Sequence, residues 1–281
     1  MISSPRIKRA HLWAPLSVLV AAVAIGLLGA QLASAAASRP PGSARPTVVL
    51  VHGDWADGSS WNAVTKRLIN RGFNVVVPPN PLRGPTEDSA YLNSFLQTIH
   101  GPIVLAAHSY GGFVITNAAL GVANVKALVY IDAFIPDQGD RLFDLVPDSC
   151  LAADPTKVFN QVPVAGGADL YLQTAPNPPY LGFADCFANG VDPQTTAVLA
   201  ATQRPAFSNQ AVETSGPPAW KTIPSWSLIG THDHVIPAGR QEFMSKRANA
   251  TIETINAGHL SLISRPESVA KLIEVAAAAV S

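Results

Sequence analysis

Three polar residues that lie far apart in the chain have the types and the order that nucleophilic catalysis needs. Ser109 directly follows an apolar run, and Asp233 and His259 each follow a predicted strand nearer the C-terminus. A serine hydroxyl becomes an effective nucleophile when a histidine accepts its proton and a carboxylate orients that histidine. The order therefore predicts one site in which Ser109 attacks, His259 is the base and Asp233 is the acid.

The stretch around Ser109, AHSYGG, is typical of the sharp strand-to-helix turn that presents a nucleophile. The usual pattern is G-x-S-x-G, and here Ala107 replaces its first glycine. Small residues are needed because the strand and the helix approach closely at such a turn. The same letters also fit a tight packing turn, so the role of Ser109 depends on the rest of the site.

A second loop is expected to supply backbone donors. The segment HGDWADGSSW (52–61) begins where the first predicted strand ends, and it therefore reaches the same edge of the sheet as Ser109. Backbone N–H groups at this place stabilise the oxyanion that forms when a serine attacks a carbonyl. We expect the amides of Asp54 and Tyr110 to form this oxyanion hole, although an HG pair is also typical of a plain strand-end turn.

Asp132 is the alternative to Asp233 as the acid, because it ends the preceding strand and also lies near the site. Asp233 is preferred because it follows the penultimate strand and precedes a helix start. His108, His232 and His234 adjoin site residues in sequence, and we expect them to support the site or to be exposed. No two histidines have the spacing of metal ligands on a helix, so the sequence predicts no metal and no cofactor.

The elements that position these residues alternate between strands and helices. Apolar β-branched runs predict the strands, and apolar residues at helical spacing predict the helices between them. This alternation predicts an α/β fold with a mostly parallel sheet and helices on both faces. The predicted strands lie in 47–53, 73–78, 102–107, 125–132, 225–233 and 250–259, and the last two ranges each hold a strand and the loop that follows it. The predicted helices are 59–72, 86–101, 112–122, 237–249 and 265–280.

Residues 136–222 interrupt the alternation. They carry 11 prolines and show no clean period. Because they lie between two strands that we expect to be neighbours in the core, we interpret them as a cap inserted over the sheet. The aromatic side chains of this segment either line a pocket or pack the cap itself.

The N-terminus has the order of a secretory signal, with basic residues in 6–9, a long apolar stretch and the sequence ASA ending at Ala35. Cleavage after Ala35 gives a signal peptide (1–35), a linker rich in Pro, Gly and Ser (36–46) and one domain (47–281). The protein is then secreted or periplasmic; the alternative is a retained membrane anchor. The mature chain has 16 basic and 19 acidic residues, a balance that does not suggest a nucleic-acid partner.

The chain has two cysteines, Cys150 and Cys186. An exported chain matures in an oxidising compartment, which favours a disulfide between them. Such a bond would close a loop of about 36 residues. A pair of buried free thiols is the alternative.

The segments HGDWADGSSW, HSYGG, THDHVIP and GHL together resemble the α/β-hydrolase superfamily over residues 47–281. The likeness is greatest to its cap-bearing serine esterase branch, in which the first loop reads HG-x7-W. Plant salicylate-ester esterases and hydroxynitrile lyases also belong to that branch. The resemblance implies the α/β-hydrolase fold with an inserted cap, and it implies the same catalytic Ser109, Asp233 and His259.

The function we expect is hydrolysis of a carboxylic ester that carries a small-to-medium hydrophobic group, through an acyl-enzyme on Ser109. The partner is then a small-molecule ester, with no nucleic acid and no membrane apart from a retained anchor. Three alternatives remain open: an acyltransferase, hydroxynitrile-lyase-type chemistry on the same triad, and a non-catalytic binding protein on this scaffold. A serine nucleophile disfavours dehalogenase and epoxide hydrolase chemistry, which use a carboxylate at that position in this fold.

Overall fold

The computed structural model describes residues 45–280 of the 281-residue chain. The predicted signal peptide (1–35) and most of the predicted linker (36–44) lie outside the described residues. Among the helices of residues 45–280, each is too short or too polar to cross a lipid bilayer.

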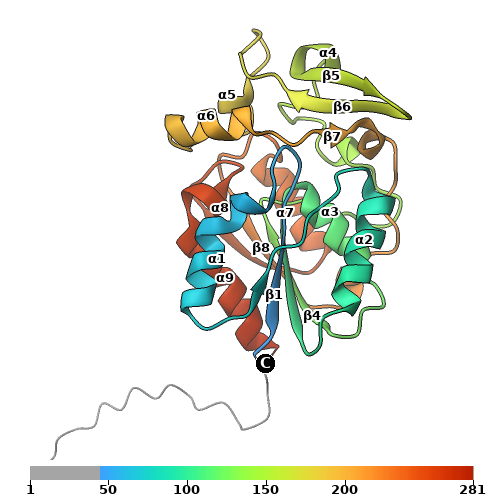
Figure 1. Cartoon of the computed structure of the whole chain (residues 1–281), viewed down its shortest axis with the longest axis vertical. Coiled ribbons are helices and arrows are strands. Elements are labelled where there is room, and N and C mark those ends of the chain that lie inside the picture. Colours follow the sequence, from blue (N-terminus) through green and yellow to red (C-terminus); the bar gives the residue numbers. More distant parts are fainter. Residues whose placement is uncertain (1–44, 281) are drawn as a thin grey trace, which may run out of the picture. The chain divides into compact units, whose positions relative to one another are not determined.

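Within this part of the chain, six parallel strands form the central sheet in the order β2-β1-β3-β4-β8-β9 (Figure 1). Most residues of the four inner strands are buried, which explains their nearly continuous apolar sequences. The α/β fold with a parallel sheet is therefore confirmed. The strands are β1 (Thr47–Val51), β2 (Val75–Val76), β3 (Ile103–His108), β4 (Val125–Ile131), β8 (Ser225–Gly230) and β9 (Thr251–Ile255).

Helices cover both faces of this sheet. α1 (Asn62–Asn70) and α9 (Pro266–Ala279) pack together on one face, and α2 (Pro85–Gln97) packs with α3 (Tyr110–Ala118) on the other (Figure 1). α7 (Ala238–Arg247) packs against β8, and the short helices η1 (Gly58–Trp61) and α8 (Ser261–Ser264) lie beside α1.

The bounds of several predicted elements differ from the structure, and two of the differences lie in β2 and α3. β2 has two residues, where the sequence suggested a strand over 73–78. α3 begins at Tyr110, two residues earlier than predicted, because the helix starts directly after the turn at Ser109. This early start brings the first free N–H groups of the helix next to the serine.

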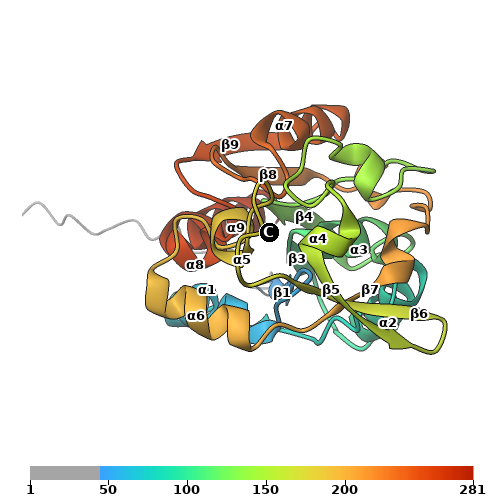
Figure 2. The ribbon, with the colours of Figure 1, turned by 90° about the horizontal axis from the view of Figure 1, so that it is seen from above.

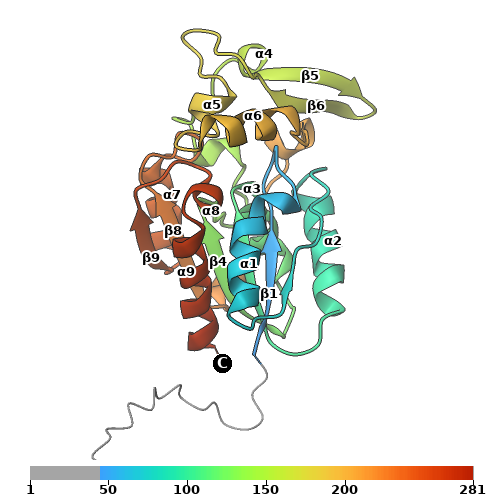
Figure 3. The same cartoon turned by 60° about the vertical axis from the view of Figure 1, so that its left-hand side comes forward.

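The chain between β4 and β8 forms a cap of short elements. Figure 3 shows them above one end of the sheet, and Figure 2 shows α4, α5 and β5 over the ends of β1, β3 and β4. Within residues 45–280 the cap strands form an antiparallel sheet in the order β5-β6-β7. The elements are η2 (Phe143–Leu145), α4 (Pro155–Val158), β5 (Phe159–Val164), β6 (Gly167–Leu172), α5 (Phe183–Cys186), α6 (Pro193–Ala201), β7 (Ala206–Phe207), η3 (Ser208–Ala211) and η4 (Ala219–Lys221).

Cys150 and Cys186 form a disulfide inside this cap. The bond joins a loop after η2 to the last residue of α5, 36 positions further along the chain. The backbone N–H of Cys150 also donates to the carbonyl of His234, at 3.0 Å, so the disulfide lies against a loop of the main domain. The cap is therefore linked covalently within itself and by hydrogen bonds to the sheet below.

Replacing both cysteines tests how much the disulfide stabilises the fold. Closing a loop of this length lowers the entropy of the unfolded chain, and the chain-entropy model gives a contribution of about 4 kcal/mol. We expect Cys150→Ala/Cys186→Ala to lower the free energy of unfolding by about that amount, measured by urea denaturation. An unchanged transition midpoint would contradict this role.

Candidate active site

Ser109 occupies a strained turn between β3 and α3. Its backbone has φ 54° and ψ −127°, a left-handed conformation that is unfavourable for a residue with a side chain. Hydrogen bonds on both sides hold this conformation. The Ser109 N–H donates to Ile131 O, and the Ser109 carbonyl accepts from Gly112 and Phe134. The turn fixes the hydroxyl at the carboxyl end of β3.

Glycines allow the neighbouring backbones to approach this turn. A Cβ atom on Gly53 would lie 2.7 Å from the Ser109 Cβ, and one on Gly111 would lie 2.8 Å from the Val51 carbonyl oxygen. A Cβ on Gly112 would lie only 2.3 Å from the carbonyl oxygen of Phe134. These contacts are too short for any larger residue, so all three positions need glycine.

His259 connects Ser109 to Asp233. Its Nε2 lies 2.9 Å from Ser109 Oγ, and its Nδ1 lies 2.8 Å from Asp233 Oδ2. All three side chains are buried, with exposed fractions of 4% or less. The structure thus places the three residues that the sequence selected in one hydrogen-bonded line.

The loop after β8 holds the Asp233 carboxylate in place. The amides of Val235 and Ile236 each donate to Asp233 Oδ1 at 2.8 Å, and the Gln241 side chain donates to Oδ2 at 2.8 Å. Burial raises the pKa of Asp233, and the bonds from the two amides oppose that shift. The loop thus leaves Oδ2 turned toward His259.

His259 lies in a fully buried position against two other rings. Phe187 of the cap packs with its ring centre 5.3 Å from that of His259, and the His108 ring lies 4.7 Å away. His108 Nε2–H donates to the carbonyl of His259 at 2.8 Å, so His108 supports the site. Burial lowers the pKa of His259 to about 3, so its imidazole is neutral at neutral pH.

Asp132, the alternative acid, lies near Asp233 but does not bond to His259. Its two oxygens accept from the backbone N–H groups of Gly230, at 2.8 Å, and Ser261, at 3.2 Å. Burial and the nearby Asp233 carboxyl raise the pKa of Asp132 well above its usual range. Asp132 thus binds together the two loops that carry Asp233 and His259.

The two amides expected to form an oxyanion hole belong to Tyr110, which follows Ser109 in the chain, and to Asp54, which follows the close neighbour Gly53. Tyr110 is the first residue of α3, where an N–H has no acceptor within the helix. Within residues 45–280 the backbone N–H of Asp54 also has no recorded acceptor. His52 positions this loop, because its ring bonds to the carbonyl of Gly53 and accepts from the N–H of Asn80.

A cavity opens onto Ser109. Side chains from both the main domain and the cap line it, and most of them are apolar. Among the described residues, its polar lining consists of Ser109, Asp54, Ser208 and Gln210. The apolar lining includes Trp55, Phe134, Phe143, Phe159, Leu170 and Val235.

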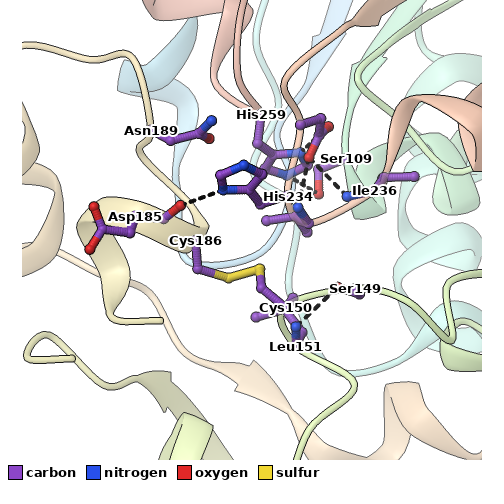
Figure 4. Close-up of a disulfide and its surroundings, with 12 residues drawn as sticks. Ser109, Ser149, Cys150, Leu151, Asp185, Cys186, Asn189, His234, Ile236 and His259 are labelled. Atoms are coloured by element: carbon purple, nitrogen blue, oxygen red, sulfur yellow. Dashed lines mark hydrogen bonds and ion pairs between the residues drawn. A yellow bond between two sulfur atoms is a disulfide. The ribbon is translucent and has the colours of Figure 1, made fainter. Parts of the chain in front are cut away.

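The cap contacts the catalytic loops at several points near the disulfide (Figure 4). The ring of His234, the residue after Asp233, donates from Nδ1 to the carbonyl of Asp185 at 2.7 Å. The Asn189 side chain donates to the carbonyl of His232 at 2.7 Å. A Cβ on Gly258 would clash with Asn189, so the cap also packs closely beside His259.

Several residues that shape the site were not identified from the sequence. They are the side-chain amides of Asn80, Gln210 and Gln241, whereas Phe187 belongs to the cap aromatics that the sequence did single out. A single glutamine or asparagine has no motif, and each of these reaches its partner through tertiary packing. Within residues 45–280 there is no group of three or more His, Cys, Asp or Glu residues that could hold a metal ion.

The model of the alpha/beta hydrolase family matches residues 48–272 of this chain. That match covers the sheet, the cap and the three residues of the hydrogen-bonded line. The chain therefore belongs to the alpha/beta hydrolase family, and the resemblance noted in the sequence is confirmed.

One curated protein has a sequence similar to part of this chain. A carbendazim hydrolyzing esterase from Nocardioides sp. (strain SG-4G) is 33% identical over 112 residues, which cover 35% of this chain and 46% of that protein. The chain thus matches about half the length of this curated relative.

Solved structures show the same fold at low sequence identity. An extracellular alpha/beta-hydrolase from a Paenibacillus species, described as sharing structural and functional homology with tobacco salicylic acid binding protein 2, has a TM-score of 0.67 and 21% identity. The match covers 82% of this chain and 98% of that one. A pyrethroid hydrolase has a TM-score of 0.67 and 21% identity, over 84% of this chain and 98% of its own.

Replacing Asp132 tests whether it stabilises the two catalytic loops. Asp132→Ala leaves the N–H groups of Gly230 and Ser261 buried without an acceptor, and each such group costs about 1–3 kcal/mol. We expect the free energy of unfolding to fall by about 3 kcal/mol in urea denaturation. Asp144→Ala, at an exposed position of the cap, is the matched control and should change it by less than about 0.5 kcal/mol. Equal effects in the two variants would contradict the role of Asp132.

Proposed function

We propose that this protein is a carboxylic ester hydrolase that works through an acyl-enzyme on Ser109. The observation that carries the proposal is the line of hydrogen bonds from Asp233 through His259 to Ser109, at the wall of an apolar cavity. The relative found by sequence is named an esterase, which also supports ester hydrolysis.

In the first half of the reaction, Ser109 Oγ attacks the carbonyl carbon of the ester while His259 Nε2 takes its proton. Asp233 fixes the tautomer of the imidazole and stabilises the imidazolium that forms. The amides of Asp54 and Tyr110 donate to the oxyanion, where the loss of one donor typically costs about 3 kcal/mol. Collapse of the intermediate breaks the ester bond, and His259 gives its proton to the leaving alcohol.

In the second half, water attacks the acyl-enzyme. His259 takes a proton from the water, a second tetrahedral oxyanion forms, and its collapse returns the proton to Ser109 Oγ. The products are a carboxylic acid and an alcohol. The atoms and charges of the two half-reactions balance without redox or metal chemistry.

The cavity supports a hydrophobic substrate of small to medium size. Apolar side chains supply most of its lining, which suits a hydrophobic acyl or alcohol group. Hydroxynitrile-lyase-type chemistry in this branch relies on a basic residue near the cap. Of the two cap lysines, Lys221 forms an ion pair with Asp137, and neither it nor Lys157 is among the described residues lining the cavity.

We also propose that the protein acts outside the cytoplasm, after cleavage of residues 1–35. The basic, apolar and small-residue order of that segment supports this proposal. The disulfide between Cys150 and Cys186 is consistent with it, because such bonds persist mainly in oxidising compartments.

Removing the nucleophile tests the proposed function. Ser109→Ala deletes the only atom that can form the acyl-enzyme, so kcat toward p-nitrophenyl butyrate should fall by about 10⁴-fold or more. Ser94→Ala, on the exposed face of α2, is the matched control and should retain the rate of the unaltered protein. Turnover by Ser109→Ala close to that of the control would overturn the assignment.

A further inference from the structure

One acidic residue lines the mostly apolar cavity. Asp54 was selected for its backbone amide, but the residue also lines the cavity together with Ser109 and is 3% exposed. A buried carboxyl group needs hydrogen-bond partners or it destabilises the fold. The partners of Asp54 therefore bear on what the cavity binds.

A single recorded contact holds this carboxyl group. Gln210 of η3, itself 3% exposed, donates from Nε2 to Asp54 Oδ1 at 3.0 Å. Among residues 45–280, Asp54 has no recorded ion pair, and no hydrogen bond is recorded for its Oδ2. The second oxygen is thus left for a group that the protein does not supply.

The surroundings favour the neutral form of this acid. Burial raises the pKa of Asp54 to about 8, the Asp88 carboxyl of α2 adds to the shift, and the bond from Gln210 opposes it. Among the described lining residues no cation faces Asp54. Because Oδ1 accepts from Gln210, the proton of the neutral acid belongs on Oδ2, which makes that oxygen a hydrogen-bond donor.

We propose that Asp54 is a specificity-determining residue whose Oδ2–H donates a hydrogen bond to an oxygen of the bound substrate. The preferred substrates are hydrophobic esters that carry a second acceptor oxygen, such as an ether, hydroxyl or carbonyl, near the scissile ester. The inference rests on the proposed ester hydrolysis, and it adds a polar requirement to a cavity whose lining is mostly apolar. A purely structural Asp54 would bind the cap through Gln210 and leave substrate preference unaffected.

Two matched pairs of esters measure this preference. p-Nitrophenyl methoxyacetate differs from p-nitrophenyl butyrate by one oxygen in place of a CH₂ group on the acyl side. 2-Methoxyethyl acetate differs from butyl acetate in the same way on the alcohol side. For each pair, the kcat/KM of the methoxy ester is divided by the kcat/KM of its alkyl counterpart. This ratio is compared between variants, so the intrinsic reactivity of the esters cancels.

We expect the ratio for at least one pair to fall by roughly 3- to 10-fold in Asp54→Leu, the change that a lost neutral hydrogen bond gives. Asp54→Asn keeps a donor and an acceptor and should retain the ratio. Asp144→Leu, the same kind of change at an exposed cap position, is the control and should match the unaltered protein. Ratios that are equal in all variants for both pairs would overturn the proposal, as would an Asp54→Asn ratio as low as that of Asp54→Leu.

A second measurement uses the unaltered protein and needs no folded variant. The donor exists only while Asp54 is protonated, so the ratio should be high below about pH 8 and fall by the same 3- to 10-fold above it. The titration of His259 affects both esters of a pair and cancels. A constant ratio from below to well above that pH would overturn the proposal.

Failure of the proposed function gives a different result. If the protein hydrolyses none of the four esters, or if Ser109→Ala hydrolyses them equally well, both the function and this inference are overturned. If hydrolysis depends on Ser109 but neither the variants nor pH changes the ratio, the inference alone is overturned.

Discussion

The site depends on one backbone constraint, the left-handed conformation of Ser109 at the end of β3. That conformation turns the chain directly into α3, which leaves the Tyr110 N–H free and projects the hydroxyl toward His259. It is maintained because neighbouring strands approach closely enough to bond the Ser109 backbone. The approach in turn requires glycine at positions 53, 111 and 112, where a side chain would collide with backbone or with Ser109 itself. The strained turn and its glycines therefore form one unit.

The cap completes the site from the opposite side. Phe187 covers the His259 ring, Asn189 and Asp185 bond to the loop that carries Asp233, and the disulfide joins α5 to the loop after η2. These contacts bury the imidazole, and the burial explains why the pKa of His259 is lowered. The same closure leaves Asp54 and Gln210 as a polar pair inside an apolar cavity. The cap thus influences both the chemistry and the selectivity that we propose.

The central sheet was predictable because its buried parallel strands are continuous apolar runs that end in a polar residue or glycine. Ser109, Asp233 and His259 were predictable for the same reason, because each follows such a strand and the carboxyl ends of parallel strands converge at one edge of the sheet. The cap sheet was not predicted. β5 is mostly exposed and contains Pro163, so its pattern is weak, although the Ala165-Gly166 turn with a positive φ at Gly166 marks a hairpin. Gln210 and Asp54 are 156 residues apart, and no local pattern predicts such a pair.

The central claim, that Ser109 is a nucleophile activated by His259, is tested most directly by covalent labelling. A fluorophosphonate reacts with an activated serine and leaves a stable adduct that peptide mass spectrometry can locate. The account predicts one adduct per chain, on the peptide that contains Ser109, and a large loss of labelling in His259→Ala. An adduct on a different residue, no adduct at all, or equal labelling of the His259 variant would contradict it.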